Sequence, residues 1–188
     1  ILNSILLQTE FPHELIIADD GSGEDTAQLI SKYEKKIPFR LKHVWQEDKG
    51  FRAARIRNIA IKESTGDYLF FSDGDLFFHS RFFHDLKRNV KPDLALIGSR
   101  VFLKEGASNE ILQTLNPKNI SFISSKIEKN RLNRVRIPIV SKMFPTKSFS
   151  EKLRGGLLCV SNKNVVAVNG WNEDFTGWGK EDTELVAR

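Results

Sequence analysis

An apolar run ends at two carboxylates in the segment Tyr68-Leu69-Phe70-Phe71-Ser72-Asp73-Gly74-Asp75. The run has the length and residue types of a buried strand, so the strand ends where the acidic turn begins. Because neighbouring carboxylates repel each other unless a cation lies near them, Asp73 and Asp75 predict a site for Mg²⁺ or Mn²⁺, which commonly brings phosphate oxygens with it. Gly74 has no Cβ and leaves room for the backbone to approach a ligand. Such tripeptides are common by chance, so an acidic turn without a ligand is the alternative interpretation.

A second apolar strand, residues 14–18, also ends in acidic residues. Asp19 and Asp20 follow it directly, and Gly21-Ser22 continues the turn. Ser22 and Asp25 predict a capping box at the start of the next helix. Strands and helices then alternate as far as residue 102, which predicts a largely parallel sheet with helices on both faces. Ligands bind beyond the carboxyl ends of the strands in such sheets, and both acidic pairs lie there.

The remaining pattern predicts the other elements. We expect helices over residues 1–9, from Ser22 to about residue 36, and over 52–63, 81–90, 109–115, 120–129, 162–168 and 181–188, with further strands over 39–44, 94–98, 101–103 and 155–160. Ser80 is the expected cap of helix 81–90. His79 is expected to be a loop histidine rather than a metal ligand.

Helix 52–63 carries a cation within its apolar face. At about 100° per residue, that face consists of Ala53, Ala54, Ile56, Ala60 and Ile61. Arg57 falls among these residues, and an unpaired charge is costly to desolvate, so we expect it to meet an anion. The candidates are Asp19, Asp20, Asp73 and a bound diphosphate. Alternatively, the long side chain reaches past the edge of the core into solvent.

Two stretches of the second half carry further signals. Between residues 129 and 154 the acidic residue is Glu151, amid many lysines and arginines. This predicts either a solvated loop or a basic flap over a diphosphate or against an anionic membrane.

Further on, two glycines flank Trp178, and Glu181-Asp182 opens the last expected helix, where the helix dipole favours carboxylates. The helix start does not require the glycine-flanked tryptophan, which suits stacking on a sugar ring.

The composition bounds the class of protein. With 188 residues, 40% hydrophobic and 28% charged, the chain is typical of one globular domain. No apolar run approaches the about 20 residues that cross a bilayer, and the first residues do not resemble a signal peptide. A single cysteine, Cys159, fits a reducing compartment. We therefore expect a cytoplasmic protein, either free or at the inner face of the cytoplasmic membrane.

The charge balance indicates the kind of partner. The net charge of +5 and the pI near 9.3 favour anionic partners such as nucleotide phosphates and anionic lipid head groups. Nucleic acid is not expected as a partner, because no basic stripe interleaved with stacking aromatics is visible.

Five short motifs fall in the order of a known family. They are Asp-Asp-Gly-Ser at 19–22, Gly-Phe-Arg at 50–52 with Arg57-Asn58, Asp-Gly-Asp at 73–75, Arg-Gly-Gly at 154–156 and Gly-Trp-Gly-Lys-Glu-Asp at 177–182. Over nearly the whole chain they resemble the family 2 glycosyltransferases with the GT-A fold. The last motif also resembles the C-terminal part of β-1,4-galactosyltransferases and of bacterial chondroitin-polymerase-type enzymes. The resemblance implies an α/β fold of the GT-A type, with a Rossmann-like, mostly parallel mixed sheet and helices on both faces.

The resemblance also implies roles for the motif residues. Residues 1–104 would form the nucleotide-sugar-binding half and residues 105–188 the acceptor-binding, catalytic half of one domain. The nucleotide would meet Asp19, Asp20, Ser22, Arg52, Arg57, Asp73 and Gly74. Asp75 would ligate Mn²⁺ (or Mg²⁺) together with Asp73. The sugars of donor and acceptor would meet Gly155, Gly156, Trp178 and Glu181. Asp182 would be the general base.

The expected activity is transfer of a sugar from a UDP-sugar to a glycan or lipid-linked acceptor, in the synthesis of a bacterial surface polysaccharide. One base and no protein nucleophile imply a single displacement with inversion. A sugar-nucleotide nucleotidyltransferase and a non-catalytic carbohydrate-binding domain are the alternatives. The family places a strand before residues 1–9 and another metal ligand, often His, after the Glu-Asp motif. We therefore expect this sequence to lack part of the complete protein at both ends.

Overall fold

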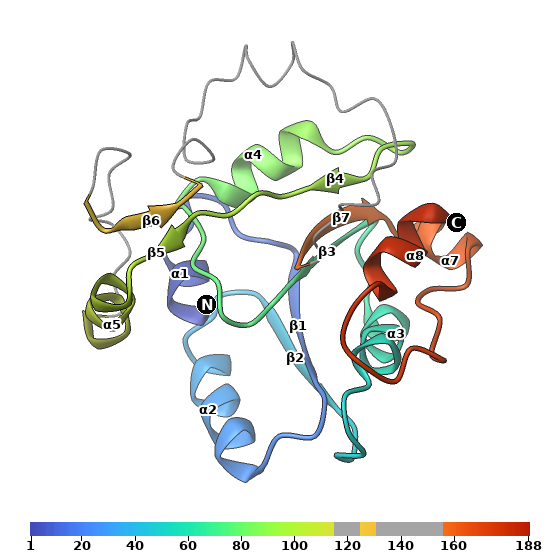
Figure 1. Ribbon diagram of the computed structural model, residues 1–188, viewed down its shortest axis with the longest axis horizontal. Coiled ribbons are helices and arrows are strands. Elements are labelled where there is room, and N and C mark those ends of the chain that lie inside the picture. Colours follow the sequence, from blue (N-terminus) through green and yellow to red (C-terminus); the bar gives the residue numbers. More distant parts are fainter. Residues whose placement is uncertain (115–124, 131–155) are drawn as a thin grey trace.

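The computed structural model describes residues 1–114, 125–130 and 156–188. The first of these ranges contains α1 (Leu2–Leu6), β1 (Glu14–Asp19), α2 (Glu24–Glu34), β2 (Arg40–Trp45), α3 (Ala53–Glu63), β3 (Tyr68–Ser72), α4 (Phe82–Asn89), β4 (Leu96–Ile97), β5 (Phe102–Leu103) and α5 (Glu105–Thr114). The later ranges contain β6 (Ile127–Lys129), β7 (Leu157–Ser161), α7 (Asn162–Ala167) and α8 (Glu181–Ala187) (Figure 1). Most of the predicted elements are confirmed to within a few residues.

The strand order brings the end of the chain into the first half. β1 and β2 pair in parallel, with Asp19 opposite Trp45 at their carboxyl ends. β7 lies between β3 and β4 and is antiparallel to both, so β3 and β4 run in the same direction. β5 and β6 form a separate antiparallel pair. In the described residues the strands thus form three sheets, of which β1–β2 is parallel as expected, whereas the pairs that involve β3, β4 and β7 are antiparallel rather than parallel.

Helices cover both sides of the strands β1 and β2. In Figure 1, α1 and α2 lie on one side of this pair and α3 lies on the other. α3 contacts both strands, and α2 contacts β2. In the same view α8, from the end of the chain, lies beside α3. This arrangement confirms an α/β architecture in which the last helix lies against α3.

β3 and β7 are mostly apolar because side chains on both of their faces pack against apolar clusters. On one face, Phe70 packs edge-on against Phe83, with ring centroids 6.1 Å apart, and Leu157 belongs to the same cluster. On the other face, Phe71 meets the ring of Trp171 at 4.4 Å in a T-shaped contact, and Leu158 packs there. Fully burying such a side chain is worth about 1.5–3 kcal/mol, so these contacts fix how β3 delivers its acidic turn.

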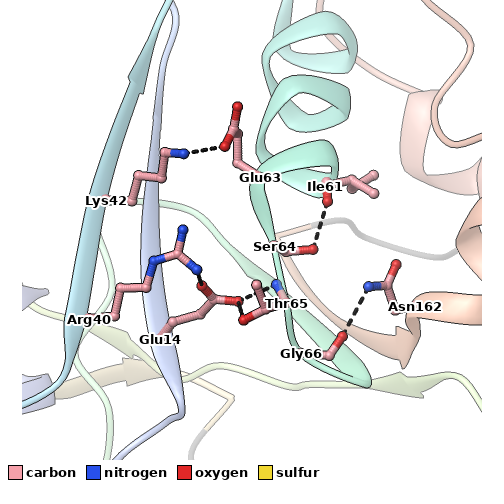
Figure 2. A network of polar contacts seen from close by, with 9 residues as sticks. All are labelled: Glu14, Arg40, Lys42, Ile61, Glu63, Ser64, Thr65, Gly66 and Asn162. Atoms are coloured by element: carbon pink, nitrogen blue, oxygen red, sulfur yellow. Dashed lines mark hydrogen bonds and ion pairs between the residues drawn. The ribbon is translucent and has the colours of Figure 1, made fainter.

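A polar network holds the opposite ends of the strands (Figure 2). Glu14, the first residue of β1, accepts hydrogen bonds from Arg40 Nη1 at 2.9 Å and from the Thr65 N–H at 2.6 Å. Lys42 pairs with Glu63 beside it. Burial raises the pKa of Glu14, but the bonds from Thr65 and the charge of Arg40 outweigh burial and lower it. The network therefore anchors the turn between α3 and β3 at the end of the sheet remote from the acidic residues.

The expected serine caps are wrong. α2 begins after Gly23 and α4 after Arg81, and neither helix start has a side-chain cap of its own. At α4 the side chain of Gln8, from the loop after α1, accepts the Phe83 N–H at 3.3 Å and so replaces Ser80. A partner so distant in sequence cannot be found from a local capping pattern.

The helix expected over 120–129 is also wrong where it can be compared. Residues 127–129 form β6, which pairs with β5, and Ile127 is buried. Residues 120–124, the basic segment 131–154 and Gly155 lie outside the described residues. In the described ranges, no helix combines the length and apolar character needed to cross a membrane.

Candidate active site

The turn after β1 is held by Asp19, which is buried. One carboxylate oxygen accepts the Ser22 N–H at 2.8 Å, and the other lies 2.9 Å from His43 Nε2. Burial raises the pKa of Asp19, but the bonds from Ser22 and His43 outweigh burial and hold it below its usual range. Both oxygens are therefore engaged within the protein, in a geometry that fixes the turn.

Asp20 connects the same turn to the start of α3. Its Oδ2 accepts the Arg52 N–H at 2.6 Å, and its Oδ1 accepts a bond from Gln46. Gln46 is buried, donates also to the Arg52 carbonyl at 3.2 Å and accepts from Arg55 Nη1 at 2.6 Å. Sequence reasoning missed Gln46, although a polar residue directly after an alternating strand could have indicated it. The indole of Trp45, 53% exposed, lies beside this turn and donates to the Ser22 carbonyl at 3.0 Å.

The end of β3 packs against the residue that precedes β7. The Asp73 N–H donates to the Gly156 carbonyl at 3.2 Å. A Cβ at Gly156 would lie 2.3 Å from Asp73 Oδ2, and Gly156 has φ +105°. The position therefore requires glycine, because a side chain would displace the Asp73 carboxylate. Arg100, which the sequence analysis did not single out, brings Nη1 to 3.5 Å from the same oxygen.

Asp73 and Asp75 are the donors available for a metal ion. In residues 1–114, 125–130 and 156–188, no three or more His, Cys, Asp or Glu side chains are grouped so as to hold one. The side chain of Asp73 is 41% exposed, and Asp75 is exposed. Mg²⁺ is usually held by one or two carboxylates with substrate phosphates and water, and Mn²⁺ has similar oxygen ligands. The donor set thus fits an ion that binds together with a diphosphate. His79 lies in the loop before α4, as expected.

Arg57 pairs with two carboxylates from the end of the chain. Its Nη1 lies 3.1 Å from Asp182 Oδ1 and 3.3 Å from Glu181 Oε1. The prediction that Arg57 finds an anionic partner is confirmed, but the proposed partners Asp19, Asp20 and Asp73 are wrong. The reason is the placement of α8 beside α3, which follows from the insertion of β7 and which no local pattern shows.

Trp171 completes the surroundings of Asp182. Its Nε1 donates to Asp182 Oδ1 at 3.2 Å, and its ring centroid lies 5.5 Å from the guanidinium carbon of Arg57. Burial raises the pKa of Asp182, the charge of Arg57 lowers it, and the charges of Glu181 and Asp73 raise it further. The net result is a raised pKa, and the contribution of Asp73 places the end of β3 within electrostatic reach of Asp182. Trp171 was missed; an apolar residue next to the glycine that closes α7 was the available signal.

Glu181 and Trp178 differ in exposure to solvent. Glu181 is 6% exposed, and its second oxygen accepts the Gly179 N–H at 3.1 Å, so it shapes the loop before α8. Lys180, just before that helix, adopts the left-handed conformation with φ +70°. Trp178 is 89% exposed. Its ring is therefore accessible for stacking, whereas the carboxylate of Glu181 is occupied by Arg57 and the loop.

The family models match the chain in two overlapping parts. The model described as glycosyl transferase family 2 matches residues 1–153, and the model described as the N-terminal domain of galactosyltransferase matches residues 136–188. The chain therefore belongs to glycosyl transferase family 2. This membership removes support from the nucleotidyltransferase alternative.

Curated relatives match over most of this chain. It is 28% identical to a hyaluronan synthase of Pasteurella multocida, covering 96% of this chain and 20% of that protein. It is 24% identical to a chondroitin synthase of Escherichia coli, covering 96% of this chain and 28% of that protein. An uncharacterized glycosyltransferase of Rickettsia bellii is 40% identical, covering 98% of this chain and 29% of that protein. The chain thus spans less than a third of the length of these relatives.

Solved structures share the fold. A crystal structure of S. aureus TarS 1-349 in complex with UDP matches with a TM-score of 0.61 and 17% identity, over 98% of this chain and 48% of that one. The mannosyltransferase PcManGT from Pyrobaculum calidifontis, in complex with GDP-Man and Mn²⁺, matches with a TM-score of 0.60 and 17% identity, over 98% of this chain and 45% of that one. These neighbours are GT-A glycosyltransferases, and the predicted fold class is confirmed.

Proposed function

We propose that this chain carries the catalytic site of a metal-dependent, inverting glycosyltransferase. It moves a sugar from a UDP-sugar to a glycan or lipid-linked acceptor in bacterial surface polysaccharide synthesis, at the cytoplasmic side of the membrane. The observation that carries the proposal is the placement of Asp182, whose Oδ1 accepts from Arg57 of α3 and from Trp171, while the Trp171 ring packs on Phe71, two residues before Asp73. A metal-binding carboxylate and a proton acceptor are thereby brought to one site from opposite ends of the sequence.

The donor lies along the carboxyl ends of β1 and β3 in this proposal. Asp19, with both oxygens engaged, holds the turn through Ser22, and Asp20 holds the backbone of Arg52. These contacts shape the surface that would meet the nucleobase within residues 1–104. The neighbours TarS and PcManGT, whose structures contain UDP and GDP-Man, support a sugar nucleotide as the donor.

Asp73 and Asp75 would hold Mn²⁺ or Mg²⁺, which would supply positive charge beside the diphosphate. When bound, the ion offsets the negative charge that the departing diphosphate gains. Gly74, between the two, leaves space around the turn, since no atom lies within 4 Å of where its Cβ would be. Gly156 allows Asp73 to keep its place beside β7. The presence of Mn²⁺ in the PcManGT complex supports this assignment.

Asp182 accepts the proton of the attacking hydroxyl. A raised pKa makes a carboxylate a better proton acceptor, and a general base must lie within hydrogen-bond reach of the hydroxyl. The acceptor oxygen forms a bond to the anomeric carbon while the bond from that carbon to the diphosphate oxygen breaks, and the electron pair leaves with UDP. One displacement inverts the anomeric centre. Exposed Trp178 stacks on the acceptor sugar, in the half formed by residues 105–188.

The experiment measures binding and transfer separately in the intact protein. UDP should raise the melting temperature only with Mn²⁺ or Mg²⁺ present, and Asp75→Ala should abolish this shift. Asp93→Ala, which removes an exposed aspartate from the turn before β4, is the matched control and should keep it. UDP release from a panel of UDP-sugars then identifies the donor, with hyaluronan and chondroitin oligosaccharides, taken from the names of the relatives, as acceptors.

Asp182→Asn tests the catalytic assignment. It should retain metal-dependent UDP binding and lose transfer, and the product of the wild-type protein should show the inverted anomeric configuration by NMR. Metal-independent UDP binding would contradict the role of Asp73 and Asp75. Transfer by Asp182→Asn would place the base elsewhere, and binding of glycans without any transfer would favour the carbohydrate-binding alternative.

A further inference from the structure

The carboxylate of Asp182 is held at one oxygen only. Arg57 Nη1 at 3.1 Å and Trp171 Nε1 at 3.2 Å both donate to Oδ1. Among the described residues, no hydrogen bond reaches Oδ2. The side chain is 17% exposed, so this oxygen is available to a ligand rather than sealed in the core. The two oxygens of one carboxylate therefore have different surroundings.

The two donors are themselves fixed in place. Arg57 is 19% exposed at its side chain, and the same Nη1 also donates to Glu181 Oε1 at 3.3 Å. Trp171 is 2% exposed; its backbone N–H donates to Asn58 Oδ1 at 2.9 Å, and Asn58 Nδ2 donates back to the Trp171 carbonyl at 2.9 Å. Its ring packs on Phe71 of β3. Trp171 is thus anchored to α3 and to β3, the strand that leads into the acidic turn, and Arg57 is anchored to the start of α8.

We propose that Arg57 and Trp171 are positioning residues that bind Oδ1 of Asp182 and direct Oδ2 toward the acceptor hydroxyl. The inference rests on the proposed function, in which Asp182 is the base. Neither residue touches the donor in this arrangement. Arg57 is thereby assigned to the base and not to the diphosphate, the role that the family resemblance implied.

The charges around Asp182 give the proposal a measurable consequence. Arg57 faces it from α3, Glu181 from the first turn of α8, and Asp73 acts on it from the end of β3. Arg57 is the one cation in this set and opposes the effects of burial and of both carboxylates. Removing it should raise the pKa of Asp182, so the acid limb of kcat/KM for transfer should move to higher pH.

The experiment compares four variants of the intact protein. Arg57→Met removes the charge, Arg57→Lys keeps the charge but not the planar fork, and Trp171→Phe keeps a ring against Phe71 but lacks the N–H donor. Lys62→Met is the control, since Lys62 lies exposed on the same helix. Metal-dependent UDP binding shows which variants are folded.

Arg57→Met should lower kcat by about 10²-fold near neutral pH, the scale of a misplaced catalytic group, with KM for the UDP-sugar unchanged. The acid limb of its kcat/KM profile should move to higher pH. Arg57→Lys should recover part of kcat, Trp171→Phe should show the same shift to a smaller extent, and Lys62→Met should match the wild type. Titration of ¹³C-labelled aspartate by NMR without substrate, with the Asp182 signal assigned by its loss in Asp182→Asn, should show the same order of pKa values.

Two results would overturn the inference. One is an acid limb and an Asp182 titration that stay at the wild-type pH in folded Arg57→Met and Trp171→Phe. The other is a loss confined to KM for the UDP-sugar, which would return Arg57 to the diphosphate. When either result is obtained, the Asp182→Asn variant shows which hypothesis is wrong. If Asp182→Asn is inactive in the same assays, only the positioning roles of Arg57 and Trp171 are wrong. If it transfers sugar, the assignment of Asp182 as the base is wrong as well.

Discussion

Replacing Gly156 by alanine should destabilise the protein and displace a metal-binding carboxylate. The added Cβ would lie 2.3 Å from Asp73 Oδ2, closer than real Cβ contacts, and the backbone has φ +105°. A non-glycine residue held in such a conformation costs about 1–3 kcal/mol. The Asp73 side chain is partly exposed and can rotate away, so the steric part of the penalty appears as a displaced carboxylate and the backbone part as lost stability.

Urea unfolding and UDP-dependent thermal shifts measure the two parts separately. Gly156→Ala should lose about 1–3 kcal/mol of unfolding free energy, and a thermal shift of about 2–4 °C for each kcal/mol follows for a chain of this size. It should also weaken metal-dependent UDP binding. Gly106→Ala, within α5 and with open space around the position, should instead gain about 0.5–1 kcal/mol from helix propensity. An unchanged stability of Gly156→Ala together with unchanged UDP binding would refute the packing of Asp73 against this residue.

Three further outcomes follow from buried groups. Burial raises the pKa of Asp19, but hydrogen bonds from Ser22 and His43 lower it overall. The stability that this group contributes is therefore present above its unfolded pKa of about 3.9 and is lost as the pH falls below that value. In urea unfolding, the free energy of unfolding of Asp19→Asn should fall less steeply with acid than that of the wild type. Burial raises the pKa of Cys159 to about 11, so thiol reagents at neutral pH should label it only after unfolding. Asn58→Ala leaves the Trp171 N–H without its partner and should cost about 1–3 kcal/mol, measured by chemical unfolding.

The sequence predicts the positions of the elements and the edge at which the site lies. The apolar run 68–71 and the strand before Asp19 are visible because strand residues that pack inside the protein form short, nearly uninterrupted apolar runs. Since ligand sites in such sheets lie beyond the strand ends, the acidic residues that follow two strands indicate the same edge. These inferences use only neighbours in sequence, and the structure confirms the strands on which they depend.

What the sequence does not show is which distant groups meet. The partners of Arg57 come from α8, and the acceptor for the Phe83 N–H comes from Gln8. Both contacts follow from long-range packing: β7 enters between β3 and β4, and α1 lies against the loop before α4. β6 was taken for a helix for the same reason, because only its pairing with β5 makes residues 127–129 extended.

Hydrogen bonding divides the acidic residues of the site into two groups. Asp19, Asp20 and Glu181 have both carboxylate oxygens engaged by protein donors. Each of these oxygens already accepts a bond from the protein, so we infer that these residues build the site.

The second group consists of acidic residues with a carboxylate oxygen that remains accessible. Asp73 and Asp75 remain open to solvent, and in Asp182 the hydrogen bonds end on one oxygen. A metal ion and a proton both need a free lone pair, which is what these three residues supply. The sequence motifs contain both groups without distinction, since residue type and spacing are the same for a supporting carboxylate and a reactive one. The hydrogen bonds separate them, and they assign the chemistry to Asp73, Asp75 and Asp182 as a proposal that the variants above test one residue at a time.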